Sequence, residues 1–168
     1  MSHLHWIAVP APGRLAIAPR PRAEDGLDGE IAGWNAAGVQ VVVCLLPSAE
    51  MVALGLQREA ALCAAAAMEF VSFPIQDFGV PGSIEDTATM VGTIAGGVTA
   101  GRSIAVHCRG GIGRSSTIAA CVLICLGVTA QRALELIAAA RGIAVPETPE
   151  QRDWVLAFET AWRSDHRS

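Results

Sequence analysis

Residues 103–126 read SIAVHCRGGIGRSSTIAACVLICL, and this stretch decides how we expect the chain to fold. Residues 103–106 form a short, largely apolar run that indicates a buried strand, and residues 117–126 form a longer run that indicates a buried helix. Three glycines lie in the loop between the two runs. A strand, a glycine-rich loop and a helix N-terminus in this order build a cradle of backbone N–H groups that holds an anion.

A cysteine and an arginine flank the five central residues of this loop. Thiols at helix N-termini and beside cations ionise readily, so we expect Cys108 to be a thiolate nucleophile at neutral pH. The planar guanidinium of Arg114 matches two phosphate oxygens and stays charged. We therefore expect the loop to bind a phosphate group and the Cys108 thiolate to attack it. The residues expected to form the phosphate-binding loop are Cys108, Arg109, Gly110, Gly111, Ile112, Gly113 and Arg114.

Two neighbours of the loop are expected to support the nucleophile. The hydroxyl of Ser115 can donate to the Cys108 sulfur and so help that sulfur to leave in a second step. His107 is expected to order the loop through hydrogen bonds rather than to transfer protons. The alternative is purely structural, because a lone cysteine is usually a small core residue and a glycine-rich strand–helix connection is often only a tight turn.

The loop resembles the Cys-x5-Arg loop of the cysteine-dependent protein tyrosine phosphatase superfamily. The resemblance covers about residues 13–160 and is strongest to the kinase-associated-phosphatase-like members of the dual-specificity branch, through segments 13–17, 38–44 and 74–77 as well as the loop. A rhodanese-like sulfurtransferase also uses a loop cysteine, but the GIGRSS ending is more similar to phosphatases. The resemblance implies a three-layer α/β sandwich with a mainly parallel central sheet flanked by helices.

An aspartate upstream of the loop is the candidate general acid. Phosphoryl transfer from an oxygen ester needs a proton for the leaving oxygen. Asp77 is the only acid between Glu69 and Glu85, and it lies in the segment FPIQDFGVP at 73–81. In the dual-specificity branch the general acid occupies a similar segment about thirty residues before the nucleophile, so the resemblance assigns Asp77 to that role. The alternative is a loop aspartate that only hydrogen-bonds its own turn.

The resemblance also assigns roles to one glutamine and one further cysteine. Thr148 and Pro149 predict the start of the last helix, and a glutamine at the position of Gln151 helps related enzymes to place the hydrolytic water. Some members keep a cysteine at the end of a neighbouring strand that traps the oxidised nucleophile as a disulfide. Cys44 is the expected redox partner of Cys108 on this basis. The alternatives are an ordinary helix start and a buried, purely packing cysteine.

Alternating strand and helix patterns indicate an α/β fold in a single domain over residues 1–168. The carboxyl ends of its strands are the expected place for the loop. The predicted elements are strands at 6–9, 15–18, 40–45, 69–75 and 103–107, helices at 28–37, 49–68 and 83–94, and three helices after the loop.

Composition narrows the expected setting of the protein. The net charge of −4 argues against a nucleic-acid partner, and no apolar run is long enough for a membrane span. The absence of an export signal and the presence of five cysteines indicate reduced thiols in the cytoplasm. No Cys-x2-Cys or His-x3-His spacing occurs, so neither a metal nor another cofactor is expected. Twelve arginines without a single lysine, together with many alanines, indicate a GC-rich bacterial genome.

The predicted activity is hydrolysis of phosphotyrosine, and secondarily phosphoserine or phosphothreonine, in a protein substrate. The chain has neither lysine nor tyrosine, so it lacks the residues that wall the deep pocket of tyrosine-specific members. Arg109 and Ile112 stand where phosphoinositide-selective members carry lysines, which disfavours a highly charged headgroup. The alternatives are a small phosphate ester such as a nucleotide, an RNA 5′ end or a phospholipid, or a phosphoprotein-binding module with weak turnover.

Overall fold

A computed structural model describes residues 3–167 of the chain. Its centre is a five-stranded sheet with the strand order β1-β2-β5-β3-β4. The β1 strand runs antiparallel to β2, and all other neighbouring strands are parallel. The strands are β1 His5–Ile7, β2 Arg14–Ala18, β3 Val41–Cys44, β4 Glu69–Ser72 and β5 Ser103–His107.

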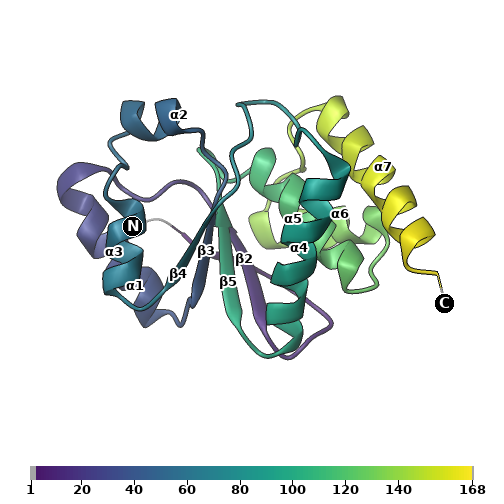
Figure 1. Cartoon of the computed structure of the whole chain (residues 1–168), viewed down its shortest axis with the longest axis horizontal. Helices are drawn as coiled ribbons and strands as arrows, with labels where there is room; N and C mark the ends of the chain where they lie inside the picture. The colour runs from purple at the N-terminus through teal and green to yellow at the C-terminus, as the bar shows by residue number, and fades with distance from the viewer. Residues whose placement is uncertain (1–2, 168) are drawn as a thin grey trace.

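Helices cover both faces of this sheet (Figure 1). On one side lie α1 and α3, and on the other lie α4, α5, α6 and α7. The expected three-layer α/β sandwich with a mainly parallel sheet is therefore confirmed. No helix in residues 3–167 has the length and apolar character needed to cross a membrane. The helices are α1 Leu27–Ala36, α2 Ser48–Ala53, α3 Glu59–Ala65, α4 Ile84–Thr99, α5 Arg114–Cys125, α6 Ala130–Arg141 and α7 Pro149–Asp165, with a short 3₁₀ turn at Glu24–Gly26.

The sheet buries a separate apolar cluster on each face, because side chains alternate along a strand. Val43 and Val106 point into the larger cluster, under the four helices from α4 to α7. Val42 and Ala105 point into the smaller cluster, under α1 and α3. The helix that follows the loop is buried along nearly its whole length. The loop is thus mounted on two elements that are buried along all or nearly all of their length, β5 and α5.

Several element ends differ from the prediction. The predicted helix at 49–68 is two helices, and the turn between them inserts Leu56 into the smaller cluster. The predicted strand at 69–75 ends at Ser72, after which single hydrogen bonds from Phe73 and Ile75 to β3 and the residue after it lead the chain toward the loop. Helix α4 continues to Thr99, five residues past its predicted end at Ile94.

Candidate active site

The loop between β5 and α5 places Cys108 at the carboxyl end of the central strand. The cysteine is only 2% exposed. The backbone N–H of Gly111 donates to its Sγ at 3.3 Å, and the thiol donates to Ser115 Oγ at 3.4 Å. When the thiol ionises, the serine hydroxyl becomes the donor, so both contacts then stabilise a thiolate.

Two glycines let neighbouring segments close around the loop. Gly111 has a φ of 69°, and a Cβ there would lie 2.6 Å from backbone atoms of Ala18 and Pro19. A Cβ on Gly113 would lie 2.6 Å from the carboxylate Oε1 of Glu147. The chain after β2 and the Glu147 side chain before α7 therefore both touch the loop. Gly111 has no room for a side chain, and a side chain at Gly113 would have to displace the Glu147 carboxylate.

Arg114 is held by groups from two other segments. Its Nη1 donates to Glu50 Oε1 and to the Ile75 carbonyl, both at 2.9 Å, and its Nη2 donates to Glu50 Oε2 at 2.9 Å. The same Nη2 lies 3.1 Å from Asp77 Oδ1. Burial by itself lowers the pKa of Arg114, but the hydrogen bonds to Glu50 and the nearby anions outweigh it and raise this pKa. The guanidinium is therefore charged and oriented before any substrate arrives.

Glu50, on the short helix α2, was not predicted as a site residue. It faces Arg114 with both carboxylate oxygens, and its pKa is lowered chiefly by the hydrogen bond from that guanidinium. Nothing in the local sequence SAEMVA separates this glutamate from an ordinary first-turn acid. Only its place opposite the loop reveals the contact.

Asp77 lies in a turn between β4 and α4, at the rim of the site. Its Oδ1 accepts a hydrogen bond from the Phe78 N–H at 3.0 Å, and its side chain is 41% exposed. Asp77 thus hydrogen-bonds its own turn, which is the structural interpretation of the sequence. It also lies against Arg114 of the loop, which places it where a general acid is expected. The neighbouring Phe78 is 59% exposed.

Gln151 is fully buried rather than exposed. Its Oε1 accepts from the N–H groups of Glu147 and Thr148, and Thr148 Oγ1 accepts from the Gln151 N–H, which completes a capping box at the start of α7. Its Nε2 donates to the carbonyl of Gly79 at 3.2 Å, two residues after Asp77. The predicted cap and first-turn proline are confirmed. The amide ties α7 to the turn that carries Asp77, and its contact with water stays a prediction.

A second arginine, Arg141, hydrogen-bonds to carbonyl groups of the loop. Arg141, the last residue of α6, donates from Nε to the Gly111 carbonyl at 3.0 Å and from Nη2 to the Gly110 carbonyl at 3.4 Å. On the other side, the Arg20 N–H donates to the Arg109 carbonyl at 3.1 Å. These contacts satisfy the carbonyls of Arg109, Gly110 and Gly111 in the loop. Arg141 was not predicted as a site residue.

The remaining predicted residues, His107 and Cys44, lie together in the smaller cluster. His107 is completely buried, and its Nδ1 lies 3.1 Å from the Cys108 carbonyl, a contact that a loop-ordering role requires. Cys44 is paired with His107 in the sheet, and its thiol donates to Met51 Sδ at 3.5 Å. Cys108 belongs to the cluster on the opposite face, and both cysteines are free thiols. A disulfide between them stays a prediction.

Comparison with known proteins gives concordant results. The family model described as "PTP-SAK: Swiss Army Knife protein, DSP-PTPase phosphatase domain" matches residues 1–154. A kinase associated phosphatase with its catalytic cysteine replaced by serine superposes with a TM-score of 0.84, at 19% identity over 95% of each chain. Tk-PTP in its active form gives 0.72, at 30% identity over 88% of this chain and 92% of that chain.

PTPMT1 in complex with PI(5)P superposes with a TM-score of 0.71, at 18% identity over 89% of this chain and 93% of the other. A comparison with curated protein sequences gives no match. The family match spans nearly the whole described chain and includes the loop in which cysteine, arginine and serine meet. This protein therefore belongs to the dual-specificity branch of the cysteine-dependent protein tyrosine phosphatases.

Proposed function

We propose that the protein hydrolyses phosphotyrosine, and secondarily phosphoserine or phosphothreonine, in a protein substrate through a phosphocysteine intermediate. One observation carries this proposal: the Cys108 sulfur and the Arg114 guanidinium sit on one loop, and Asp77 lies 3.1 Å from that guanidinium. A nucleophile, an anion clamp and a proton donor thus share one small volume.

In the first step the Cys108 thiolate attacks phosphorus in line with the leaving oxygen. The sulfur–phosphorus bond forms as the phosphorus–oxygen bond breaks, and Asp77 gives its proton to the departing oxygen. Arg114 and the N–H groups of the loop stabilise the charge on the equatorial oxygens. Before this step the substrate phosphate displaces the Asp77 carboxylate from Arg114, and the freed carboxylate takes up a proton from water beside the substrate oxygen.

In the second step water attacks the phosphocysteine and Asp77 takes its proton. The sulfur leaves as a thiolate, to which the Ser115 hydroxyl donates, and inorganic phosphate is released. Gln151, bonded to the carbonyl of Gly79, orders the turn in which Asp77 accepts that proton. The groups that these two steps use come from three segments: the loop with the start of α5, the turn that carries Asp77, and the start of α7.

The preference for an aromatic phosphoester is supported by Phe78, which presents an exposed ring beside the general acid. Arg109 supports the alternative, because its exposed cationic side chain can meet a second anionic group on a phospholipid or nucleotide. PTPMT1 has been crystallised with a phosphoinositide. A substrate panel of phosphotyrosyl and phosphoseryl peptides, a nucleoside monophosphate and an inositol phosphate distinguishes the two.

The decisive test of covalent catalysis uses Cys108→Ser with p-nitrophenyl phosphate in the presence of a chelator. Turnover should vanish while tungstate, which mimics phosphate, still binds, because the cradle survives without its nucleophile. Arg114→Lys should lose both, because a point charge cannot reproduce the two-pronged guanidinium contact. Substantial hydrolysis by the serine variant would refute the mechanism.

A further inference from the structure

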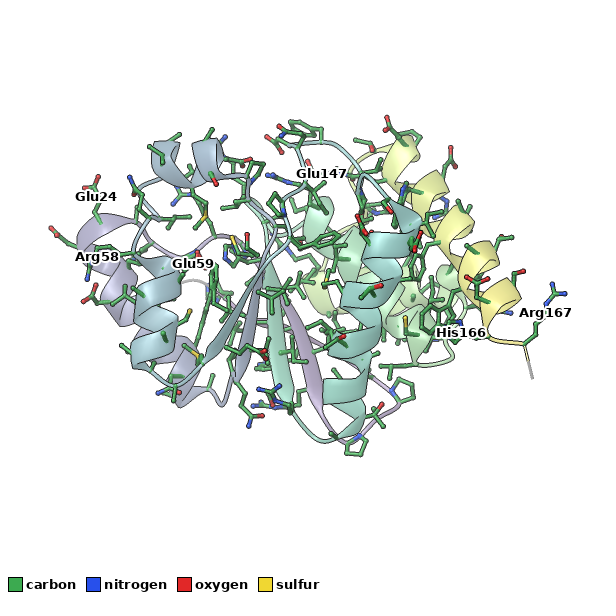
Figure 2. The ribbon with its side chains drawn as sticks, viewed as in Figure 1. Glu24, Arg58, Glu59, Glu147, His166 and Arg167 are labelled. Carbon is green, nitrogen blue, oxygen red and sulfur yellow. The ribbon has the colours of Figure 1, made fainter. Side chains whose placement is uncertain are left out.

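A group of three buried polar side chains lies behind the loop, on the opposite face of the sheet. It comprises Cys44 at the end of β3, Glu59 at the start of α3 and His107 at the end of β5, and their polar atoms all lie within 4.8 Å of one another. Glu59 and His107 are each 0% exposed. Figure 2 shows Glu59 on the side of the molecule that carries α1 and α3. The two catalytic steps above do not use this glutamate.

Both nitrogens of the His107 ring face hydrogen-bond acceptors. The Nδ1 lies 3.1 Å from the Cys108 carbonyl, which can only accept, so Nδ1 carries a proton. The Nε2 lies 2.5 Å from Glu59 Oε1. An ionised carboxylate also only accepts, so the same ring donates from both nitrogens and is an imidazolium. Glu59 is therefore the group that selects the charged form of His107.

The electrostatic surroundings favour the same state. Burial alone lowers the pKa of His107, but the Glu59 carboxylate and Cys44 hold it well above the ordinary value. The Trp34 ring, centred 5.7 Å from His107, carries no charge, and burial raises the pKa of Cys63 to about 12, which keeps that thiol neutral. A charge with so little water around it acts strongly on adjacent groups.

A contribution to the stability of the fold does not by itself explain why a glutamate is buried at position 59. Glu59 Oε2 has no hydrogen-bond partner among the described residues, and the same is true of Trp34 Nε1. Unsatisfied buried polar atoms are rare in folded proteins, and an apolar side chain in place of a buried ionic one is often neutral or stabilising. A glutamate at this position is better explained by what it does to His107, whose ring is bonded to the nucleophile's own carbonyl.

We propose that Glu59 is a positioning residue for the nucleophile: it holds His107 as an imidazolium, which anchors the Cys108 carbonyl and favours the Cys108 thiolate. The inference rests on the proposed role of Cys108 as the nucleophile. The Arg114 guanidinium, which is paired with Glu50 and Asp77, is a second cation near the sulfur. Under this proposal the His107 imidazolium and the Arg114 guanidinium both favour the thiolate.

The first test observes His107 directly and needs no substrate. The chain contains only four histidines, so ¹⁵N NMR of the imidazole nitrogens can resolve each of them, and the signals missing from His107→Asn identify the buried one. Both nitrogens of His107 should carry protons at pH 8, where an ordinary histidine is neutral. A neutral ring at that pH would overturn the proposal.

The second test follows alkylation of Cys108 by iodoacetamide as a function of pH. In Glu59→Gln, the midpoint of this curve should rise by about one pH unit, because the neutral amide no longer holds the positive charge. Glu30→Gln is the matched control: Glu30 is also a buried carboxylate, it lies on α1 beside Arg22, and its loss should leave the midpoint unchanged. An unchanged midpoint in folded Glu59→Gln would overturn the proposal.

The same group of donors raises one competing interpretation, a transition-metal site formed by sulfur, carboxylate and imidazole. The 2.5 Å contact favours a hydrogen bond, because two ligands that each lie about 2.0 Å from one ion stand farther apart than that. Elemental analysis of the purified protein decides the matter, and one metal equivalent removed by Glu59→Gln would refute the imidazolium.

Failure of the proposed phosphatase function would look different. The wild-type protein would then be inactive, while the NMR signals of His107 and the alkylation curve of Cys108 would still be as expected.

Discussion

Arg114 is buried, charged and already hydrogen-bonded along one edge, so its position depends on Glu50. Glu50→Gln replaces a charged acceptor pair by one amide oxygen and loses roughly 1.5–3 kcal/mol of interaction with the guanidinium. We expect kcat/KM for p-nitrophenyl phosphate to fall about 10- to 100-fold, because 1.4 kcal/mol corresponds to a factor of ten. Steady-state kinetics check this, with circular dichroism to show that the variant is folded. Unchanged kinetics would mean that the loop alone orients Arg114.

The pH dependence of this contact has a definite sign. The folded pKa of Glu50 is lowered, so the ion pair stabilises the fold fully above the ordinary carboxyl pKa of 4.5 and is lost as pH falls through the lower folded value. Wild type and Glu50→Gln should therefore differ most in urea unfolding near pH 6 and converge toward pH 3. A constant difference across that range would contradict the ion pair.

Three carboxylates lie at the loop, those of Glu50, Asp77 and Glu147, and only Asp77 is proposed to move protons. Asp77→Asn should lower kcat about 10²- to 10⁴-fold for a phosphotyrosyl peptide, the usual range for general acid catalysis. The loss should shrink for p-nitrophenyl phosphate, whose leaving group needs little protonation. The basic limb of the pH–rate profile should disappear with Asp77.

Glu147→Gln is the control for this prediction, because the Glu147 carboxylate lies against Gly113 of the loop; Figure 2 labels Glu147 near the top of the view. It should retain the basic limb and most of the rate. The reverse pattern, in which Glu147→Gln loses the limb and Asp77→Asn keeps it, would transfer the acid role to Glu147.

Some site residues are recognisable from the sequence and others are not. Cys108 and Arg114 are recognisable because strand, glycine loop and helix put them in one local pattern. Glu50 and Glu59 are not recognisable, because each lies on a short helix that is far from the loop in the sequence. The order of the strands in the sheet brings these helices close to the loop. No local pattern distinguishes a glutamate that reaches across the fold from one that faces water.

At the scale of elements, the sequence predicts the existence and type of most helices and strands, and the differences lie at their ends. The strand after α3 stops early because the chain must leave the sheet to carry Ile75 and Asp77 to Arg114. The long predicted helix divides because a turn buries Leu56 and lets α3 begin at Glu59. Both departures serve the site, and neither has a strong turn signal in the sequence.

The start of α7 links helix stability to the acid-bearing turn. Thr148→Ala removes the cap that receives the Gln151 N–H, and this class of substitution costs about 1 kcal/mol. Because Gln151 also holds Gly79, we expect the free energy of unfolding in urea to fall by about 1 kcal/mol and kcat to fall as well.

Thr129→Ala, at the equivalent cap of α6, provides the comparison. Thr129 receives the Arg132 N–H, so its loss should cost a similar amount of stability with little change in kcat. Equal kinetic losses in the two variants would show that the capping box of α7 acts only through global stability.

For the whole molecule, the alternation of elements predicted the α/β sandwich, but it left the order of the strands open. Parallel strands can be arranged in several ways with the same helices between them. The observed order places β3 beside β5, which pairs Cys44 with His107. Glu59, at the start of α3, packs against this pair. The buried group behind the loop is thus a property of topology, and the chain sequence alone does not reveal it.

The absence of lysine and tyrosine has a consequence for stability in alkali. Cysteines are the only side chains whose ordinary pKa lies between about 8 and 12 in this chain. Burial raises the pKa of Cys63 and of Cys125 to about 12, and that of Cys121 well above its usual value. Above pH 9 the unfolded chain therefore loses thiol protons that the folded protein keeps, so stability must fall as pH rises.

The fully buried Cys121 alone should contribute a slope of about 1.4 kcal/mol per pH unit in this range, since the unfolded state binds one proton fewer. Urea unfolding between pH 8 and pH 10.5, with reductant present, measures the slope for wild type and Cys121→Ala. The variant should be less stable at pH 8, because it leaves a cavity, yet its stability should decline less steeply with pH. Parallel curves would show that the buried thiols do not control alkaline unfolding. A shallower curve for Cys121→Ala would identify the cysteines as the groups that limit this lysine-free, tyrosine-free fold at high pH.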